Sequence, residues 1–170
     1  MRIQKLIAST GVASRREAEQ MVLDGRVKVN GEVILRPGHP IELYQDIVLV
    51  DGKPLPPRAD THYFALHKPK GCITSRNDPE GRKSVHDLLG GIPHRLEPIG
   101  RLDFNTSGLL LFTNDGTLAH QLTHPSQNVP KRYRVKIWKR PQERQLNRLK
   151  RGIRLEDGIT KPAKLRILEE

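Results

Sequence analysis

The sequence lacks the features of a secreted or membrane-spanning protein. Its 170 residues contain one cysteine, Cys72, so no intramolecular disulfide can form, and a single thiol fits a reducing compartment. There is no run of about 18 apolar residues, and the N-terminal MRIQKLIASTG has no signal-peptide hydrophobic segment. These absences predict a cytoplasmic protein with no membrane partner.

Acidic residues are also scarce relative to basic ones. Nineteen Asp and Glu oppose 30 Lys and Arg, which gives a net charge of +11 and a pI of about 10.2. A field of that sign favours polyanions, and nucleic acid is the first candidate. An anionic membrane surface is the alternative, but the sequence shows no basic amphipathic helix with aromatic anchors.

The N-terminal segment has the pattern of two short helices and a small hairpin sheet. Apolar residues at 3, 6 and 7 share one helical face, and Ser14 opens a second helix with Glu17 at capping-box spacing. Asn30-Gly31 between the β-like runs 27–29 and 32–35 is a strong hairpin signal. A third strand is predicted at 47–50, before a tight turn at Asp51-Gly52.

Five basic residues of this segment are candidates for RNA contact. Arg15 and Arg16 open the second helix, where backbone N–H groups also point toward a phosphate. Three further cations extend that surface, namely Arg2, Lys5 and Lys28. A solvated basic face is the alternative, since residues 1–58 carry nine basic and seven acidic side chains. The pattern alone leaves both interpretations open.

Residues 53–61, KPLPPRADT, carry three prolines and predict a stiff linker between two domains. A strand is predicted at 62–67, followed by the basic turn Lys68-Pro69-Lys70-Gly71, and one helical turn is predicted at 85–89. The sequence before Ser84 superficially matches a phosphate-binding loop. The position of that loop's first glycine is Asn77, so no nucleotide-binding loop is predicted.

Residues 100–116, GRLDFNTSGLLLFTNDG, join a charged loop to an apolar strand. The run 108–112 predicts a strand buried on both faces, and Arg101 and Asp103 precede it among turn formers. A charged loop at the end of a buried strand can present a reactive group on a rigid support. A lone loop aspartate is nevertheless more often a turn or capping residue, and the local pattern alone does not decide between these roles.

A helix is predicted at 117–122, capped by Asn114 or Asp115. His120 and His124 are four residues apart, which is metal-ligand spacing on a helix. No third ligand is evident nearby, so no metal site is predicted.

Basic residues are concentrated between 131 and 154, where eleven Lys and Arg accompany one acid. Residues 131–137, KRYRVKI, alternate and predict a half-buried strand with Tyr133 on the apolar side and cations opposite. A solvated helix over 142–151 accounts for other cations. Two further strands are predicted at 152–155 and 163–168, with an Asp157-Gly158 turn between them.

These motifs together resemble the bacterial ribosomal pseudouridine synthases that carry an S4 domain. KLIASTGVASRREAEQMVLDGRVKVNGEVI resembles an S4 domain, a module that binds structured RNA through the face with the Ser-Arg-Arg turn. GRLD, NTSGLLLFTNDG, KPKG, NDPEGR, LTHP and K-x-Y-x-V resemble the catalytic domain. The similarity extends over essentially the whole chain, and NDPEGR and LEDG favour the type-B synthases of the large ribosomal subunit.

The resemblance implies an α+β architecture. An S4 RNA-binding domain occupies 1–52, the linker 53–61, and a catalytic domain with a mixed, largely antiparallel sheet occupies 62–170. The resemblance also implies further strands and a basic motif similar to N-R-Q-[VI]-R-R, whose arginine pairs with the catalytic aspartate. The sequence ends before such a motif, so 62–170 is expected to be the N-terminal portion of that domain.

The resemblance assigns roles residue by residue. Asp103 corresponds to the catalytic aspartate, Arg101 to the arginine that helps hold the uridine out of the helix, and Tyr133 to the tyrosine that packs on the base and takes the C5 proton. The implied reaction is isomerisation of a uridine in large-subunit ribosomal RNA, carried out by a monomer without cofactor or metal. A non-enzymatic binder of ribosomal RNA is the alternative. The predicted RNA-binding residues are Arg2, Lys5, Arg15, Arg16, Lys28, Lys68, Lys70, Lys131 and Arg132.

Overall fold

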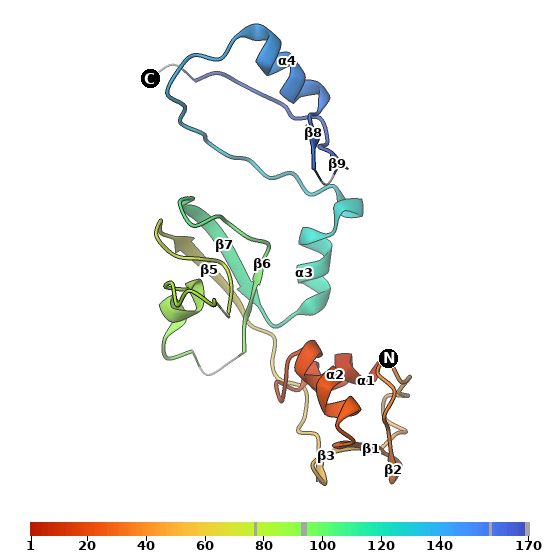
Figure 1. Ribbon diagram of the computed structural model, residues 1–170. Helices are drawn as coiled ribbons and strands as arrows, with labels where there is room; N and C mark the ends of the chain where they lie inside the picture. The colour runs from red at the N-terminus through yellow and green to blue at the C-terminus, as the bar shows by residue number, and fades with distance from the viewer. Residues whose placement is uncertain (77, 93–94, 157, 169–170) are drawn as a thin grey trace. The chain divides into compact units, whose positions relative to one another are not determined.

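The computed structural model describes residues 1–76, 78–92, 95–156 and 158–168 (Figure 1). The chain divides into two compact units, residues 1–129 and 130–170, and each is described by itself. Asn77, at the position compared with a phosphate-binding loop, and Asp157, in the predicted second-unit turn, lie outside the described residues.

Two helices and a four-stranded antiparallel sheet form the N-terminal part of the first unit. The sheet has the order β2-β1-β3-β4, and both predicted helices and the predicted hairpin are confirmed. The second and third strands are shorter than predicted. The elements are α1 (Ile3–Ser9), α2 (Arg15–Leu23), β1 (Val27–Val29), β2 (Glu32–Val33), β3 (Val48–Val50) and β4 (Lys53–Pro54).

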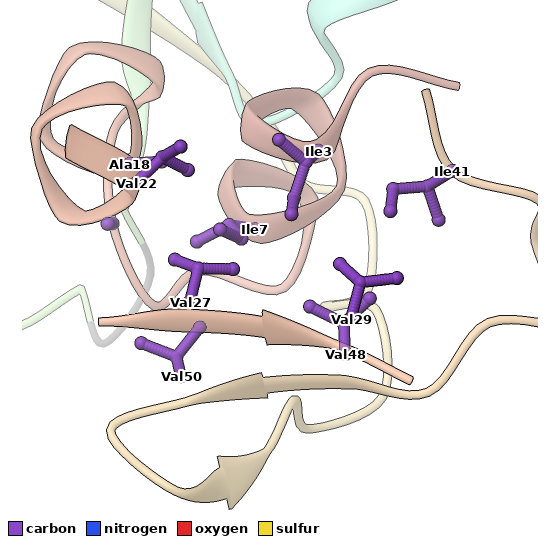
Figure 2. Packing of buried hydrophobic residues seen from close by; sticks show 10 residues of the cluster. Ile3, Ile7, Ala18, Val22, Val27, Val29, Ile41, Val48 and Val50 are labelled. Carbon is purple, nitrogen blue, oxygen red and sulfur yellow. The ribbon is translucent and has the colours of Figure 1, made fainter. Parts of the chain in front are cut away.

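An aliphatic core joins the helices to the sheet, as Figure 2 shows. Alternate residues of β1 and β3 point toward α1 and α2, whose own buried residues recur at helical spacing. Full burial of one such side chain stabilises the fold by about 1.5–3 kcal/mol. The labelled members of this core are Ile3, Ile7, Ala18, Val22, Val27, Val29, Ile41, Val48 and Val50.

Two tight turns set the register of this sheet. Asn30 and Gly31 both have positive φ, 50° and 89°, as a two-residue type I′ hairpin turn requires. Asp51 and Gly52 repeat this geometry with φ of 51° and 76°. The second turn leads into β4, so the first two residues of the predicted linker are paired with β3.

A capping box begins α2, as predicted. The Glu17 N–H donates to Ser14 Oγ at 3.2 Å, and the Ser14 N–H donates to Glu17 Oε2 at 2.7 Å. Glu17 Oε2 also lies 2.9 Å from Arg95 Nη1. The Ser14 N–H, and after it the Arg95 guanidinium, lower the pKa of Glu17 from 4.5 to about 2.

Glu17→Gln is expected to destabilise the protein at neutral pH, because glutamine keeps the capping geometry and loses the charge. The pKa of Glu17 is lower in the folded state. The ionised Glu17 carboxylate therefore contributes fully to the free energy of unfolding above pH 4.5, and this contribution is lost as the pH falls from 4.5 toward about 2. Urea unfolding of parent and variant at several pH values measures the free energy of unfolding of each. The difference between the two free energies should become smaller as the pH falls through this interval. A constant difference, or a Glu17 carboxyl NMR titration centred at 4.5, would contradict the assignment.

A three-stranded antiparallel sheet follows, in the order β5-β7-β6 (Figure 1). Its strands are β5 (Tyr63–Lys68), β6 (Glu97–Ile99) and β7 (Gly108–Thr113). The sequence did not predict β6, which contains Pro98. Proline has no N–H to donate, and it is accommodated because β6 lies at an edge of this sheet.

Strand β7 lies in the middle of the sheet, but only one of its faces is buried along the length of the run 108–112. Leu110 and Phe112 are 2% and 1% exposed, whereas Leu109 is 68% exposed. The prediction of a strand buried on both faces is therefore wrong, because an antiparallel sheet can leave one face to solvent. The core on the buried face comprises Cys72, Val85, Leu96, Leu110 and Phe112.

Short helices connect to this sheet. The predicted turn at 85–89 is the 3-10 helix η1 (Val85–Leu89), and the predicted helix after β7 is α3 (Gly116–Thr123). Of the two candidate caps, Asp115 is the one used: its Oδ1 accepts from the N–H groups of the second and third residues of α3, at 2.8 and 3.1 Å. A second 3-10 helix, η2 (Pro125–Gln127), ends this part of the chain.

The second unit contains α4 (Glu143–Arg151) and a hairpin of β8 (Arg154–Leu155) and β9 (Gly158–Ile159). The helix predicted at 142–151 is confirmed. No strand forms at 131–137 or 163–168, and Val135 and Ile137 are 74% and 55% exposed. Both strand predictions are wrong for this structure, since an alternating pattern becomes a strand only beside a partner strand.

Among the described residues, no helix combines the length and the apolar character needed to cross a membrane.

Candidate active site

Arg101 and Asp103 lie in the loop that joins β6 to the central strand β7 (Figure 1). The loop returns the chain between two paired strands, so the sheet fixes both of its ends. The Thr106 N–H donates to the Asp103 carbonyl at 3.0 Å and closes a turn within it. Both charged side chains are exposed, as a loop that presents groups to a ligand requires.

Lys68 supports this loop from beneath. It is the last residue of β5, pairs in register with Gly108, and is 0% exposed. Its ammonium donates to the carbonyl oxygens of Asp103 and Thr106, each at 2.8 Å, and to that of Pro69 at 3.1 Å. This burial contradicts the prediction that Lys68 contacts RNA, because its donors are directed to main-chain oxygens inside the protein.

The turn after β5 makes further contacts with the loop. Gly71, with φ of +79°, donates its N–H to the Phe104 carbonyl at 2.9 Å. Thr74 is 7% exposed, and its hydroxyl binds the main chain of Leu102. Sequence reasoning missed Thr74, and no local pattern marks it. Lys70, in the same turn, is exposed and stays a candidate for RNA contact.

The carboxylate of Asp103 takes no part in this support. All the hydrogen bonds described above use main-chain atoms of the loop, and no side-chain hydrogen bond or ion pair of Asp103 exists among the described residues. The carboxylate of Asp115, by contrast, caps the N-terminus of α3. Asp103 closes the turn through its main-chain carbonyl, whereas its carboxylate caps no helix or turn among the described residues and faces solvent on a fixed backbone.

Tyr133 belongs to the second unit, whereas Arg101 and Asp103 belong to the first. Tyr133 is 60% exposed and lies in a segment without helix or strand. Lys131 and Arg132, which precede it, are exposed as well. The sequence places cations beside the tyrosine, and the structure leaves all three side chains accessible to a ligand.

The predicted RNA-binding cations of the N-terminal part are all exposed. None of them forms an ion pair with an acid in the described part of the chain. Arg26 differs, since its guanidinium binds both carboxylate oxygens of Asp51, at 2.8 and 2.7 Å. Charge that is not neutralised within the fold is available to phosphates. The cations concerned are Arg2, Lys5, Arg15, Arg16 and Lys28.

His120 and His124 are exposed at the C-terminal end of α3, and their rings stack with centroids 4.5 Å apart. The described ranges contain no group of three or more His, Cys, Asp or Glu arranged to hold a metal ion. A pocket near η1 is lined by Arg76, His86 and three aliphatic residues, and neither Arg101 nor Asp103 lines it.

Comparison with known proteins assigns both parts of the chain. Residues 1–48 match the S4 domain, and residues 62–164 match the RNA pseudouridylate synthase family. The chain is 47% identical over 167 residues to ribosomal large subunit pseudouridine synthase B of Bacillus subtilis, with 98% of this chain and 68% of that protein covered. It is 46% identical over 169 residues to an RNA pseudouridine synthase of Aquifex aeolicus, covering 99% and 68%.

A solved structure agrees with these matches. The crystal structure of a pseudouridylate synthase aligns with a TM-score of 0.55 and 29% identity, over 99% of this chain and 73% of that one. The resemblance noted from the sequence and its α+β fold are thereby confirmed. The chain belongs to the family of RNA pseudouridine synthases, as a member that carries an N-terminal S4 domain.

Proposed function

We propose that this chain isomerises a specific uridine to pseudouridine in large-subunit ribosomal RNA, with Asp103 as the catalytic carboxylate. The observation that carries the proposal is the exposed carboxylate of Asp103 on a loop whose main chain is held by Lys68, Gly71 and Thr74. The choice of the large subunit is supported by the name of the Bacillus subtilis relative. We infer a monomer that acts in the cytoplasm.

The reaction explains why a fixed, accessible carboxylate is needed. The C1′–N1 bond breaks, the base rotates, and C5 joins C1′; C5 then loses its proton and N1 gains one, so the product is an isomer. A base stacked in a helix cannot rotate in this way, and the nucleotide must first be flipped out, at a cost of a few kcal/mol. No electrons are transferred and no water is consumed, so the chemistry requires no redox cofactor.

Three residues share the work in this proposal. The Asp103 carboxylate attacks the sugar or the base, or removes a sugar proton, and each route starts from an accessible anion. Arg101, two residues earlier in the same loop, occupies the space from which the uridine leaves the helix. Tyr133 packs on the base and accepts the C5 proton, in a stretch of chain rich in cations.

RNA binding is assigned to two basic surfaces. The S4 part contributes Arg15 and Arg16, at the N-terminus of α2, with Arg2, Lys5 and Lys28. The synthase part contributes Lys70, Lys131 and Arg132, which are exposed. Folded RNA is recognised mainly through its shape and phosphates, and exposed cations on rigid elements suit that kind of contact.

The test is release of tritium from large-subunit ribosomal RNA transcribed with 5-tritiated uridine. The C5 hydrogen leaves only when isomerisation is completed, so release to water measures the reaction itself. RNA transcribed with 6-tritiated uridine is the control, because C6 keeps its hydrogen. Binding without release would reject the isomerase and favour the alternative of a non-enzymatic binder of ribosomal RNA.

Replacing Arg15 and Arg16 together by alanine is expected to lower RNA affinity about tenfold or more, because two phosphate contacts are lost at the start of α2. Filter binding measures the affinity, and circular dichroism checks that the helix persists. Arg36→Ala with Lys53→Ala removes the same charge from exposed positions in the same part of the chain. Equal losses in both double variants would show a general charge effect and contradict the assignment.

A further inference from the structure

A single hydroxyl fixes the peptide groups of the residue that precedes Asp103. The Thr74 hydroxyl donates to the Leu102 carbonyl at 2.7 Å, and its oxygen accepts from the Leu102 N–H at 3.2 Å. One side chain thus replaces the paired strand that would otherwise satisfy both groups. The Leu102 side chain packs against the core beneath β7, so the residue is held by its main chain and by its side chain.

Thr74 is itself held on both sides. The Ile73 N–H donates to the Lys83 carbonyl and the Val85 N–H to the Ile73 carbonyl, each at 2.9 Å. The Ser84 hydroxyl also donates to the Ser75 carbonyl. Val85 is 0% exposed. The hydroxyl therefore projects from a segment tied to the start of η1, and it cannot shift without disturbing a packed core.

The hydrogen bonds to the loop lie on both sides of Asp103 in the sequence. Thr74 holds Leu102, on the N-terminal side of Asp103, while the Lys68 ammonium binds the carbonyls of Asp103 itself and of Thr106, on the C-terminal side. The peptide between Leu102 and Asp103 is thus fixed on both sides of the carboxylate-bearing residue. Loss of the hydrogen bonds on one side leaves that peptide free to rotate, and its rotation redirects the carboxylate.

We propose that Thr74 is a positioning residue for Asp103: acting through Leu102, it orients the catalytic carboxylate without touching RNA. This inference rests on the proposed function of Asp103. Active-site groups must be held within about 0.5 Å of their productive position, and a displacement near 1 Å costs about 100-fold in rate. The expected signature is a loss in kcat with KM preserved, since no RNA contact is removed.

The test compares Thr74→Val with Thr74→Ser. Valine has the same shape and no hydroxyl, so kcat for tritium release should fall about 10- to 100-fold while KM changes less than about threefold. Serine keeps the hydroxyl and should restore most of kcat. Thr10→Val is the matched control, because Thr10 is also nearly buried and donates to a carbonyl, that of Ile7, at 2.7 Å. That control should leave kcat unchanged.

Amide hydrogen exchange of Leu102 gives a reading that does not depend on activity. Its N–H is protected by the Thr74 oxygen, so it should exchange faster in Thr74→Val and at the parent rate in Thr74→Ser. Parent kcat in Thr74→Val, or unchanged Leu102 protection, would overturn the proposal. If the parent chain releases no tritium, the proposed function fails, and Leu102 protection alone decides whether Thr74 holds the loop.

Discussion

Asp103→Asn is expected to reduce tritium release by at least about 10³-fold, because asparagine keeps the shape of the side chain and removes the anion on which the reaction depends. The fold should be unaffected, since the support of the loop uses its main chain and makes no use of this carboxylate. RNA affinity should stay within about twofold of the parent or rise slightly, because a negative charge near the phosphates is removed.

Asp60→Asn provides the matched control for this prediction. It is the same substitution at an exposed residue in the segment between the two domains, and it should release tritium at the parent rate. Thermal unfolding and RNA binding of both variants separate a loss of chemistry from a loss of structure. Release by Asp103→Asn at a rate close to the parent would show that another group performs the reaction.

RNA affinity is expected to fall steeply with salt. Each phosphate neutralised by Lys or Arg contributes about 0.7–0.9 to the slope of log affinity against log salt. Eleven basic residues accompany one acid between 131 and 154, and about six phosphate contacts would lower affinity about 10³-fold between about 50 and 200 mM salt. Fluorescence anisotropy with a labelled ribosomal RNA fragment measures this slope.

Two double variants locate the contacts behind that slope. Lys131→Gln with Arg132→Gln should lower its magnitude by about 1.4–1.8, the contribution of two phosphates. Arg144→Gln with Arg148→Gln removes the same charge from exposed positions on α4. This variant should change the slope of log affinity against log salt by a smaller amount. A flat salt response of the parent would contradict the electrostatic basis of RNA binding. A larger change in the α4 variant would move the contact surface to that helix.

The parts of the fold that the sequence predicted are those fixed by neighbours in the chain. The capping box at Ser14 and Glu17 and the turns at Asn30-Gly31 and Asp51-Gly52 follow from interactions over a few residues. The helices predicted near 117–122 and 142–151 likewise formed, within a residue or so of the expected bounds. Local chemistry decides such elements whatever the rest of the fold does.

The errors concern interactions between distant parts of the chain. Lys68 is 35 residues from Asp103 in sequence, and a lysine in a basic turn gives no sign that its ammonium will be buried against that residue's carbonyl. The alternating pattern at 131–137 predicted a strand, but alternation does not supply the partner that a strand requires. Strand β6 was missed because Pro98 argues against a strand unless its place at the sheet edge is known.

The hydrogen bonds that hold the loop carrying Asp103 are made by its main chain. Carbonyl and N–H groups of Leu102, Asp103, Phe104 and Thr106 make the described hydrogen bonds between the loop and residues 68–74. Every amino acid except proline offers the same groups. The side chains at the exposed positions 104 and 105 can therefore change without loss of the hydrogen bonds that fix the backbone at Asp103.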